Sequence, residues 1–311
     1  MTRTWRAFAK INRDLRVLGR RGDGYHEIRT TMETVDLADR IRVSDAERFE
    51  FRSTAPPSDE TNLVVRAVRA FERETGLDVR LRVELDKRIP AGMGLGGGSS
   101  DAAVTVLGLS RIYGVRLEGE RLYAILGELG SDVPFFALGG RALALGRGEI
   151  LYPLPDRTEG GGDGGESEAG RGAPDDGGWL VLALPTTPVS TAEAYSWLTE
   201  TYEGSTILGF CARFVPALCG SRPAPDARLN DFEAALFPRF PELAEIKAQL
   251  RSSGAREVSL TGSGAALYGE FEREDAARDA VRHLGGRCRT ELVRPVSRSG
   301  YFERLFPRAD D

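Results

Sequence analysis

The chain has 311 residues, of which 41% are hydrophobic, and its 42 lysines and arginines against 47 aspartates and glutamates give a formal net charge of −5. A chain of this length exceeds the size at which one hydrophobic core stops growing, so we expect two lobes that share one site. The basic residues are scattered along the sequence, which argues against a nucleic-acid-binding protein because such a protein needs a basic face.

Cysteine usage and hydropathy narrow the class further. Cys211, Cys219 and Cys288 form no CxxC pair, so neither a disulfide framework nor a zinc site is indicated, and we expect reduced thiols. No apolar run reaches membrane-spanning length, and the first residues show no signal or transit pattern. We therefore expect a soluble, cytoplasmic protein, a monomer or weak homodimer, with neither a nucleic-acid nor a membrane partner.

Two polar motifs come first along the chain. They are Ala9-Lys-Ile-Asn12 and Gly19-Arg-Arg-Gly-Asp-Gly-Tyr-His26. Each of these residues has an ordinary interpretation when it is considered alone. Lys10 would be a solvated charge, and the Tyr-His pair would be exposed surface residues after a Gly-Asp-Gly turn. Their meaning depends on the rest of the sequence.

Hydrophobic periodicity predicts a mixture of helices and strands. Residues 79–85 alternate apolar and charged side chains, which indicates a strand with one wet face. Residues 62–71 carry the apolar spacing of an amphipathic helix. Further helices are predicted at 99–113, 118–128, from about 191, at 242–251 and at 273–284, and further strands at 141–145, 179–184, 257–260 and 265–271. This order indicates an α+β fold with substantially antiparallel sheets.

One segment differs in composition from the rest. Residues 156–178 are rich in glycine and acidic residues and nearly free of apolar ones, so they cannot bury enough surface to order themselves. We interpret them as a flexible insert between a first domain, residues 1–155, and a second, residues 179–311. Residues 308–311 are expected to be a frayed tail.

A glycine-rich loop is the strongest functional signal. Pro90-Ala-Gly-Met-Gly-Leu-Gly-Gly-Gly-Ser-Ser-Asp101 holds five glycines within seven positions and leads into a helix that we expect to begin near Ser99 or Ser100. Because glycine lacks a Cβ, successive backbone N–H groups can converge on an anion, and a helix N-terminus adds its unpaired N–H groups and positive dipole end. The loop therefore predicts a phosphate site.

Three other interpretations of this loop are weaker. Gly92 to Gly97 satisfies the GxGxxG pattern of dinucleotide-binding folds, but the preceding strand is half polar and too far from the first glycine for that turn. A Walker A loop is excluded because no Gly-Lys-Ser/Thr follows the glycines. A merely flexible loop would not carry Leu95 among the glycines and Ser-Ser-Asp at the helix start.

The loop and four further motif regions together resemble the GHMP kinases. Residues 89–103 are similar to the ATP-binding motif of that family, and the other regions agree in order along the chain. Those regions are Ala9–Asn12 with Gly19–His26, Gly130-Ser-Asp-Val-Pro-Phe-Phe136 with Gly146-Arg-Gly-Glu149, Asn230-Asp-Phe-Glu233, and Leu260-Thr-Gly-Ser-Gly-Ala265. The triple glycine before Ser-Ser-Asp resembles the branch that phosphorylates 4-diphosphocytidyl-2-C-methyl-D-erythritol in the non-mevalonate isoprenoid pathway.

The resemblance implies a fold and a reaction. The fold would be α+β with two lobes, an N-terminal lobe like domain 2 of ribosomal protein S5 and a ferredoxin-like C-terminal lobe, with the active site between them. The reaction would transfer phosphate from ATP, with Mg²⁺, to the 2-hydroxyl of the substrate. The resemblance implies Asp132 as the base and Lys10 as its partner, since an adjacent ammonium keeps an aspartate ionised. Without the resemblance, Asp132 in its Gly-Ser-Asp-Val-Pro turn would be interpreted as an ordinary helix or turn cap.

The resemblance also implies two sets of binding residues. The nucleotide set comprises Asn62, Lys87, Pro90, Ala91, Gly92, Met93, Gly94, Leu95, Gly96, Gly97, Gly98, Ser99 and Ser100. The substrate set comprises Asn12, Tyr25, His26, Thr261, Gly262, Ser263 and Gly264, with the Tyr-His pair on the cytosine base. Plainer alternatives remain: Asn12 bonds a neighbouring backbone group, residues 261–264 form a hairpin turn, and Asn230-Asp231 caps a helix. No metal-ligating residue is assigned.

Two departures from the family bear on packing. Arg13 and Asp14 stand where apolar residues are usual, and Thr261 replaces a common serine. If the first motif lies on a strand, Arg13 shares a face with Ile11 and Leu15, so either its stem lies along apolar surface or that face is partly wet. The alternative functions are another GHMP kinase, of the homoserine or mevalonate type, and a catalytically inactive relative that senses a ligand.

Overall fold

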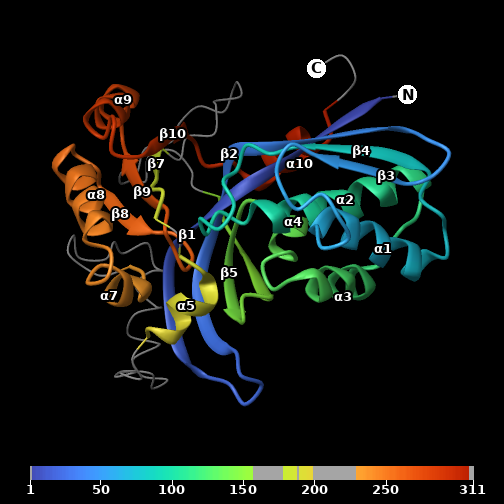
Figure 1. The fold of residues 1–311 in the computed structure, drawn as a ribbon, viewed down its shortest axis with the longest axis horizontal. Coiled ribbons are helices and arrows are strands. Elements are labelled where there is room, and N and C mark those ends of the chain that lie inside the picture. Colours follow the sequence, from blue (N-terminus) through green and yellow to red (C-terminus); the bar gives the residue numbers. More distant parts are fainter. Residues whose placement is uncertain (1, 157–177, 188, 199–228, 308–311) are drawn as a thin grey trace, which may run out of the picture.

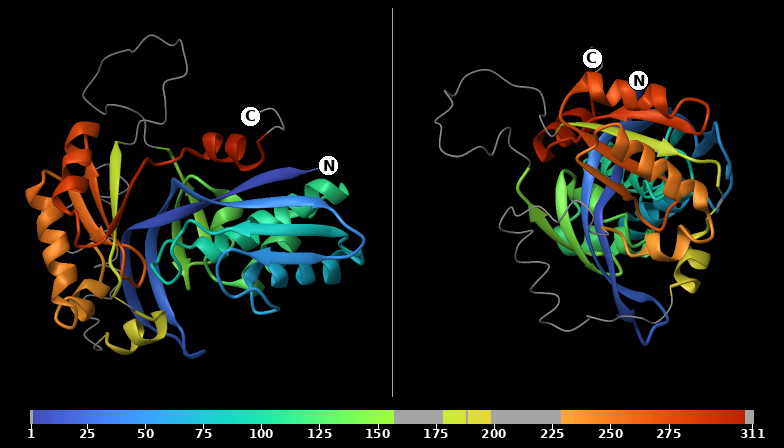
Figure 2. Two further views of the ribbon diagram at one scale, coloured as in Figure 1. Left: turned by 45° about the horizontal axis from the view of Figure 1, so that its top comes forward. Right: turned by 90° about the vertical axis from the view of Figure 1, so that its left-hand side faces the viewer.

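A long β-hairpin forms the centre of the molecule. The computed structural model describes residues 2–156, 178–187, 189–198 and 229–307. Strands β1 (Arg3–Arg20) and β2 (His26–Asp45) pair antiparallel along their whole length, and their tip extends beyond the lobes (Figure 1; Figure 2, left). Because the hairpin contacts both lobes, its residues can line a site between them.

The N-terminal lobe packs helices on one face of this sheet. Strand order is β3-β4-β2-β5-β6, with β1 beside β2. The added strands are β3 (Glu50–Ser53), β4 (Leu81–Asp86), β5 (Arg141–Gly146) and β6 (Ile150–Leu154). The helices are α1 (Leu63–Thr75), α2 (Gly97–Tyr113), α3 (Gly119–Leu129) and α4 (Phe135–Leu138). Inward residues such as Phe71, Val83 and Leu109 are fully or almost fully buried and form the core between helices and sheet.

The C-terminal lobe is a second, four-stranded sheet in the order β10-β7-β9-β8. Its strands are β7 (Trp179–Leu184), β8 (Glu257–Leu260), β9 (Leu267–Phe271) and β10 (Arg289–Val293). Helices α8 (Pro241–Ser252) and α9 (Glu274–His283) cover its outer face, and α5 (Thr191–Ser196) and α7 (Phe232–Leu236) lie at its lower end (Figures 1 and 2). The last helix, α10 (Arg298–Leu305), returns to β1, where the rings of Tyr301 and Phe8 lie 5.6 Å apart.

The predicted elements after residue 60 are confirmed within a few residues where they are described. Helix α2 begins at Gly97, slightly before the predicted start at Ser99 or Ser100. Strands β1, β2, β3, β6 and β10 and helices α4 and α10 were not predicted, and α7 was expected only as the helix that Asn230-Asp231 would cap. The reason in β1 is physical, because register shifts near Phe8, Asn12 and Val17 interrupt the period-2 alternation by which a strand is recognised.

The wet-face alternative for Arg13 is wrong. Arg13 falls in the bulge between Asn12 and Asp14 and is 5% exposed, and its guanidinium lies 5.3 Å from the ring centroid of Tyr268. It is buried among three carboxylates, pairing with Glu33 of β2, with Glu270 of β9 at 2.6 Å and with Glu257 of β8 at 3.4 Å. The bulge aims the guanidinium into the contact between the lobes.

Some expectations fall outside the described residues. They concern most of the 156–178 insert, Cys211, Cys219 and the tail at 308–311. Cys288 is half-buried and forms no disulfide. In the described ranges, no helix has both the length and the apolar character needed to cross a membrane.

Candidate active site

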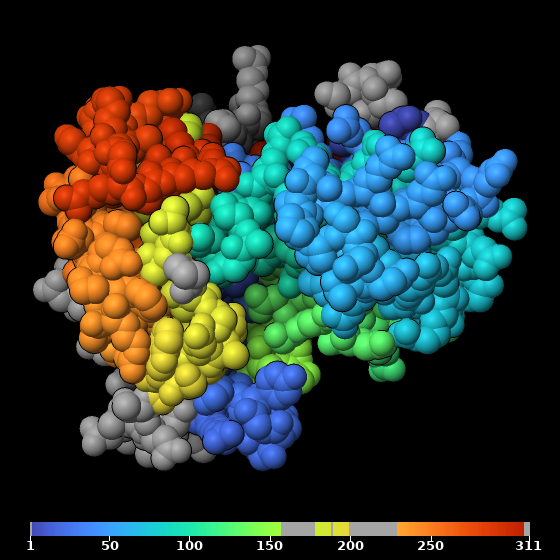
Figure 3. Space-filling model, viewed as in Figure 1, coloured from blue at the N-terminus to red at the C-terminus, as the bar shows by residue number. Residues whose placement is uncertain are grey.

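A cleft of about 1150 Å³ lies between the lobes. The space-filling view shows the molecule hollowed between the α5 segment and the N-terminal lobe (Figure 3). Both lobes and the hairpin contribute to its wall. The lining residues include Lys10, Asn12, Tyr25, His26, Gly94, Gly96, Ser99, Ser131, Asp132, Arg147, Thr191, Tyr195, Phe232, Gly262 and Ser263. The cleft thus gathers five sequence motifs that lie far apart along the chain.

The glycine loop closes one end of this cleft in a conformation that requires glycine. Gly92, Gly94 and Gly96 have φ angles of 70°, 73° and 70°. A Cβ on Gly96 would lie 2.8 Å from the ring of Phe136 and 3.1 Å from Cγ of Lys10. The carbonyl oxygen of Leu95 accepts a hydrogen bond of 3.0 Å from the backbone N–H of Lys10. The loop is therefore seated on β1 at the lysine itself.

The glycine loop also touches the Thr261–Gly264 loop of the other lobe. A Cβ on Gly94 would lie 2.3 Å from the carbonyl oxygen of Thr261. The second loop does connect strands β8 and β9, as the hairpin-turn alternative held. It is held from behind by Asn230, whose amide donates to the carbonyl oxygens of Leu260 at 3.0 Å and Gly262 at 2.8 Å. Asn230 also accepts from the N–H of Phe232 at 3.0 Å, so it holds this loop as well as the start of α7.

We expect Gly94→Ala to separate these two loops. The added methyl group would collide with backbone that cannot move away as a side chain could, an overpacking that costs about 1–3 kcal/mol. Gly92→Ala is the matched control, because Gly92 has nearly the same φ but nothing within 4 Å of its Cβ position. Urea unfolding of both variants measures the difference, and equal free energies of unfolding would contradict a backbone contact between the loops.

Lys10 and Asp132 meet on the floor of the cleft. Nζ of Lys10, in β1, lies 3.2 Å from Oδ2 of Asp132, which stands in the turn after α3. The lysine side chain is 3% exposed and that of the aspartate 30%, so the pair has a buried and an accessible partner. An acidic group that water and small molecules can reach, beside a fixed ammonium, suits proton transfer from a bound alcohol.

Asn12 orients the lysine. Its side-chain oxygen accepts a 2.6 Å hydrogen bond from Nζ of Lys10, and its amide donates to Oγ1 of Thr30 at 2.8 Å. Its backbone N–H donates to Oγ1 of Thr261 at 2.9 Å. With these partners, Asn12 links the ammonium of the pair to the hairpin and to the second glycine loop.

An aromatic group lies at the other end of the cleft. The ring of His26 stacks on Tyr195 of α5, with centroids 4.6 Å apart, and Tyr195 meets Phe232 edge to face at 4.8 Å. Tyr25, at the hairpin tip, is 58% exposed, and the guanidinium of Arg147 lies 4.9 Å from its ring centroid. Partial burial, followed by the charge of Arg20, lowers the pKa of His26, so the imidazole is neutral at pH 7.

Sequence reasoning missed several of these residues. Tyr195, Phe232, Arg147 and Thr191 line the cleft and were not assigned to it. Arg147 and Phe232 stand inside quoted motifs, so their positions were a usable signal. Tyr195 stands in no motif, and only the packing of α5 against the hairpin brings it to His26.

Two residues that the resemblance assigns to the nucleotide make polar contacts within the protein. Asn62 caps α1, where its side chain accepts from the N–H of Val64 at 2.9 Å. Lys87 is paired with Asp39 and with Asp101, the latter at 2.7 Å. The structure places Lys87 behind the glycine loop, where Nζ lies 3.2 Å from the Cβ position of Gly97.

Comparison with known proteins gives a consistent result. Two family models match the chain, "GHMP kinases N terminal domain" over residues 62–140 and "GHMP kinases C terminal" over residues 218–289. The 4-diphosphocytidyl-2-C-methyl-D-erythritol kinase of Solibacter usitatus is 40% identical over 302 residues, which cover 95% of this chain and 89% of that protein.

Solved structures agree with these matches. A crystal structure of 4-(cytidine 5'-diphospho)-2C-methyl-D-erythritol kinase is 34% identical, with a TM-score of 0.73, covering 94% of this chain and 98% of that one. A homoserine kinase from Cytophaga hutchinsonii, at 16% identity and a TM-score of 0.64, covers 94% and 93% and shares the fold alone. The predicted two-lobed α+β fold is confirmed.

Proposed function

Because this chain belongs to the GHMP kinase family, we propose that it is the kinase that phosphorylates the 2-hydroxyl of 4-diphosphocytidyl-2-C-methyl-D-erythritol. It is an ATP-dependent small-molecule kinase, as its relatives are. The observation that carries the proposal is the cleft itself, whose wall brings together the Lys10–Asp132 pair, a glycine loop and an aromatic group. We assign the glycine loop to the phosphates of the donor, the Lys10–Asp132 pair to the reacting hydroxyl, and the aromatic group to the cytosine base of the acceptor.

The chemistry assigned to the pair is one proton transfer. As the hydroxyl oxygen of the substrate bonds to the γ-phosphorus, Asp132 accepts the hydroxyl proton and the bond from the γ-phosphorus to the ADP oxygen breaks. Lys10, held by Asn12 and 3.2 Å from the carboxylate, steadies the developing alkoxide. The N–H groups of the glycine loop and of the start of α2 bind the triphosphate.

We propose that Mg²⁺ accompanies the nucleotide. The described residues contain no group of three His, Cys, Asp or Glu side chains that could hold a metal ion. Mg²⁺ held mainly by phosphate oxygens and water needs no such group, so the residues fit it. Ser99 on the cleft wall would supply a protein ligand, and the bound cation would neutralise charge on the phosphates.

The aromatic group suits a cytosine base. Tyr25 and Tyr195 offer ring faces, and the neutral His26 carries one N–H donor and one acceptor that can read the edge of the base. We propose that Asn12, Gly262 and Ser263, which line the cleft, contact the diphosphate. Thr261 is fully buried and would act by accepting the hydrogen bond from the backbone N–H of Asn12.

Tyr25→Ala tests the base site. We expect KM for the cytidyl substrate to rise roughly 5- to 100-fold, since stacking contributes about 1–3 kcal/mol per base. KM for ATP should not change. Tyr152→Ala is a matched control, because Tyr152 of β6 is 52% exposed against 58% for Tyr25 and is not part of the cleft wall. Equal KM values for the two variants would contradict the assignment.

A coupled ADP-release assay over three acceptors tests the function as a whole. We expect turnover with the cytidyl substrate and little with homoserine or mevalonate. Preference for either of those would identify another GHMP kinase. Ligand binding without ADP release from any acceptor would identify an inactive sensor, against which the Lys10–Asp132 geometry argues.

A further inference from the structure

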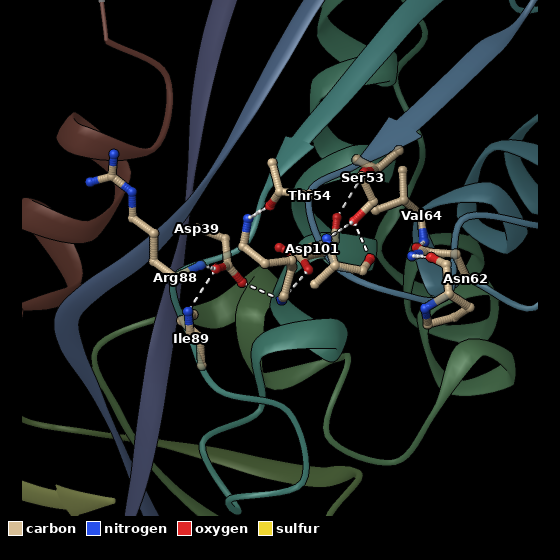
Figure 4. A network of polar contacts seen from close by, with 12 residues as sticks. Asp39, Ser53, Thr54, Asn62, Val64, Arg88, Ile89 and Asp101 are labelled. Atoms are coloured by element: carbon tan, nitrogen blue, oxygen red, sulfur yellow. Dashed lines mark hydrogen bonds and ion pairs between the residues drawn. The ribbon is translucent and has the colours of Figure 1, made fainter. Parts of the chain in front are cut away.

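A buried ion-pair network lies against the glycine loop (Figure 4). Its centre is the ammonium of Lys87, which follows β4 and pairs with Asp39 of β2 and with Asp101 of α2. Asp39 is 0% exposed and Asp101 2%, so both carboxylates are withdrawn from water. Burying charged groups is costly unless they are paired, and here one ammonium pairs with two carboxylates.

The two carboxylates hold opposite ends of the loop. Oδ1 of Asp39 accepts hydrogen bonds from the backbone N–H groups of Arg88 at 2.5 Å and Ile89 at 2.8 Å, immediately before the loop. Asp101 stands in the first turns of α2, immediately after it, and Oδ2 accepts from Lys87 at 2.7 Å. The lysine therefore joins the entry of the loop to its exit.

The loop rests against this network. A Cβ on Gly97 would lie 2.9 Å from the side chain of Ile89 and 3.2 Å from Nζ of Lys87. Gly97 is the first residue of α2, so the ammonium lies against the backbone that would receive the phosphates. A change in the network would displace that backbone.

We propose that Asp39 and Asp101 are positioning residues for ATP, which with Lys87 form a clamp that sets the span of the glycine loop. The inference rests on the proposed function in taking ATP as the ligand of this loop. Neither aspartate touches the nucleotide; each acts through the backbone it holds. The chemistry at Lys10 and Asp132 lies outside the clamp.

The protonation of Asp101 reduces the charge of the clamp. Burial, followed by the charge of Asp39, raises the pKa of Asp101 to about 8, although Lys87 opposes the shift. The charges of Lys87 and Asp39 are the two that act most strongly on Asp101. At pH 7 Asp101 is therefore largely protonated and contributes little negative charge behind the phosphates. Asparagine at position 101 is the closest mimic of that state.

Calorimetric titration with a non-hydrolysable ATP analogue, without acceptor, tests the clamp. We expect Asp101→Ala to weaken binding about tenfold or more, because the ammonium loses its hydrogen-bond acceptor at 2.7 Å and α2 loses its tie to the loop entry. Asp101→Asn should bind within about threefold of the unmodified protein, since its amide oxygen still accepts from Lys87. At saturating ATP, kcat of both should stay within about threefold of the unmodified value, because the base and its partner are untouched.

Val104→Ala controls for general loosening of α2. Val104 is a fully buried residue of the same helix outside the clamp, so this variant should melt at a lower temperature and keep its ATP affinity. Unchanged affinity in Asp101→Ala, or an equal loss in Val104→Ala and Asp101→Asn, would overturn the proposal. No binding of the analogue to the unmodified protein would instead contradict the proposed kinase function.

Discussion

Asp132→Asn is expected to lower kcat by about 10²–10⁴-fold, the range that a general acid–base group contributes. Asparagine keeps the shape of the side chain but cannot accept the hydroxyl proton. The ammonium of Lys10, which lies 3.2 Å from Oδ2 of Asp132, would then face a neutral amide. Steady-state kinetics at saturating acceptor and ATP measures the loss. Calorimetric titration with an ATP analogue should show unchanged binding, because the glycine loop is seated on Lys10 and Phe136 and not on Asp132.

Asp86→Asn is the matched control for this experiment. The side chain of Asp86 is 32% exposed, close to the 30% of Asp132, and it pairs with Arg88 at 3.3 Å. It ends strand β4 and is not part of the cleft wall, so its kcat should be close to that of the unmodified protein. Near-normal turnover in Asp132→Asn, with the control also normal, would remove Asp132 as the base.

Arg13→Met is expected to lower the free energy of unfolding by about 3–5 kcal/mol, because breaking a buried pair leaves uncompensated charge. Glu33 has a side-chain exposure of 1% and Glu270 of 14%, and both pair with the Arg13 guanidinium. These pairs join β1 and β2 to β9, so the loss falls on the contact between the lobes. Urea denaturation followed by circular dichroism measures it.

Two further variants separate the buried charge from other effects. Arg278→Met removes a helix-surface pair with Glu274 in which the arginine is 59% exposed, and it should change the unfolding free energy by less than about 0.5 kcal/mol. Adding Glu33→Met to Arg13→Met should recover part of the lost stability, since one of the three carboxylates that pair with Arg13 is then gone. The recovery is partial because Glu33 also pairs with Arg141 at 3.3 Å. A loss below about 1 kcal/mol in Arg13→Met would show that the cluster carries little of the lobe contact.

Local pattern was enough for much of the fold. The alternation of residues 79–85 predicts β4, and the apolar spacing of 62–71 predicts α1, because each element buries one face of its own sequence. The central hairpin lacked this signal. Its bulges break the alternation, and pairing between residues 3–20 and 26–45 makes up for that irregularity only in three dimensions.

The same division holds in the candidate site. The glycine loop predicts a phosphate site from composition alone, since no other residue lets backbone approach so closely. The pairing of Lys10 with Asp132 joins residues that are far apart in sequence, and only resemblance to a family suggested it before the structure brought the two side chains together. Tyr195 had no local signal at all, because its ring matters only where α5 meets His26.

Local sequence pattern predicts a phosphate loop and the strands and helices that bury one regular face, and its motifs point to the family that the comparisons confirm. Only packing in three dimensions brings Gly94 to Thr261, the carboxylates to Arg13, and Lys87 to Asp39 and Asp101. The physical reason is that backbone conformation and amphipathic pattern are short-range properties of a chain. Ion pairs, ring stacking and the shape of a cleft depend on the distances between segments that packing sets.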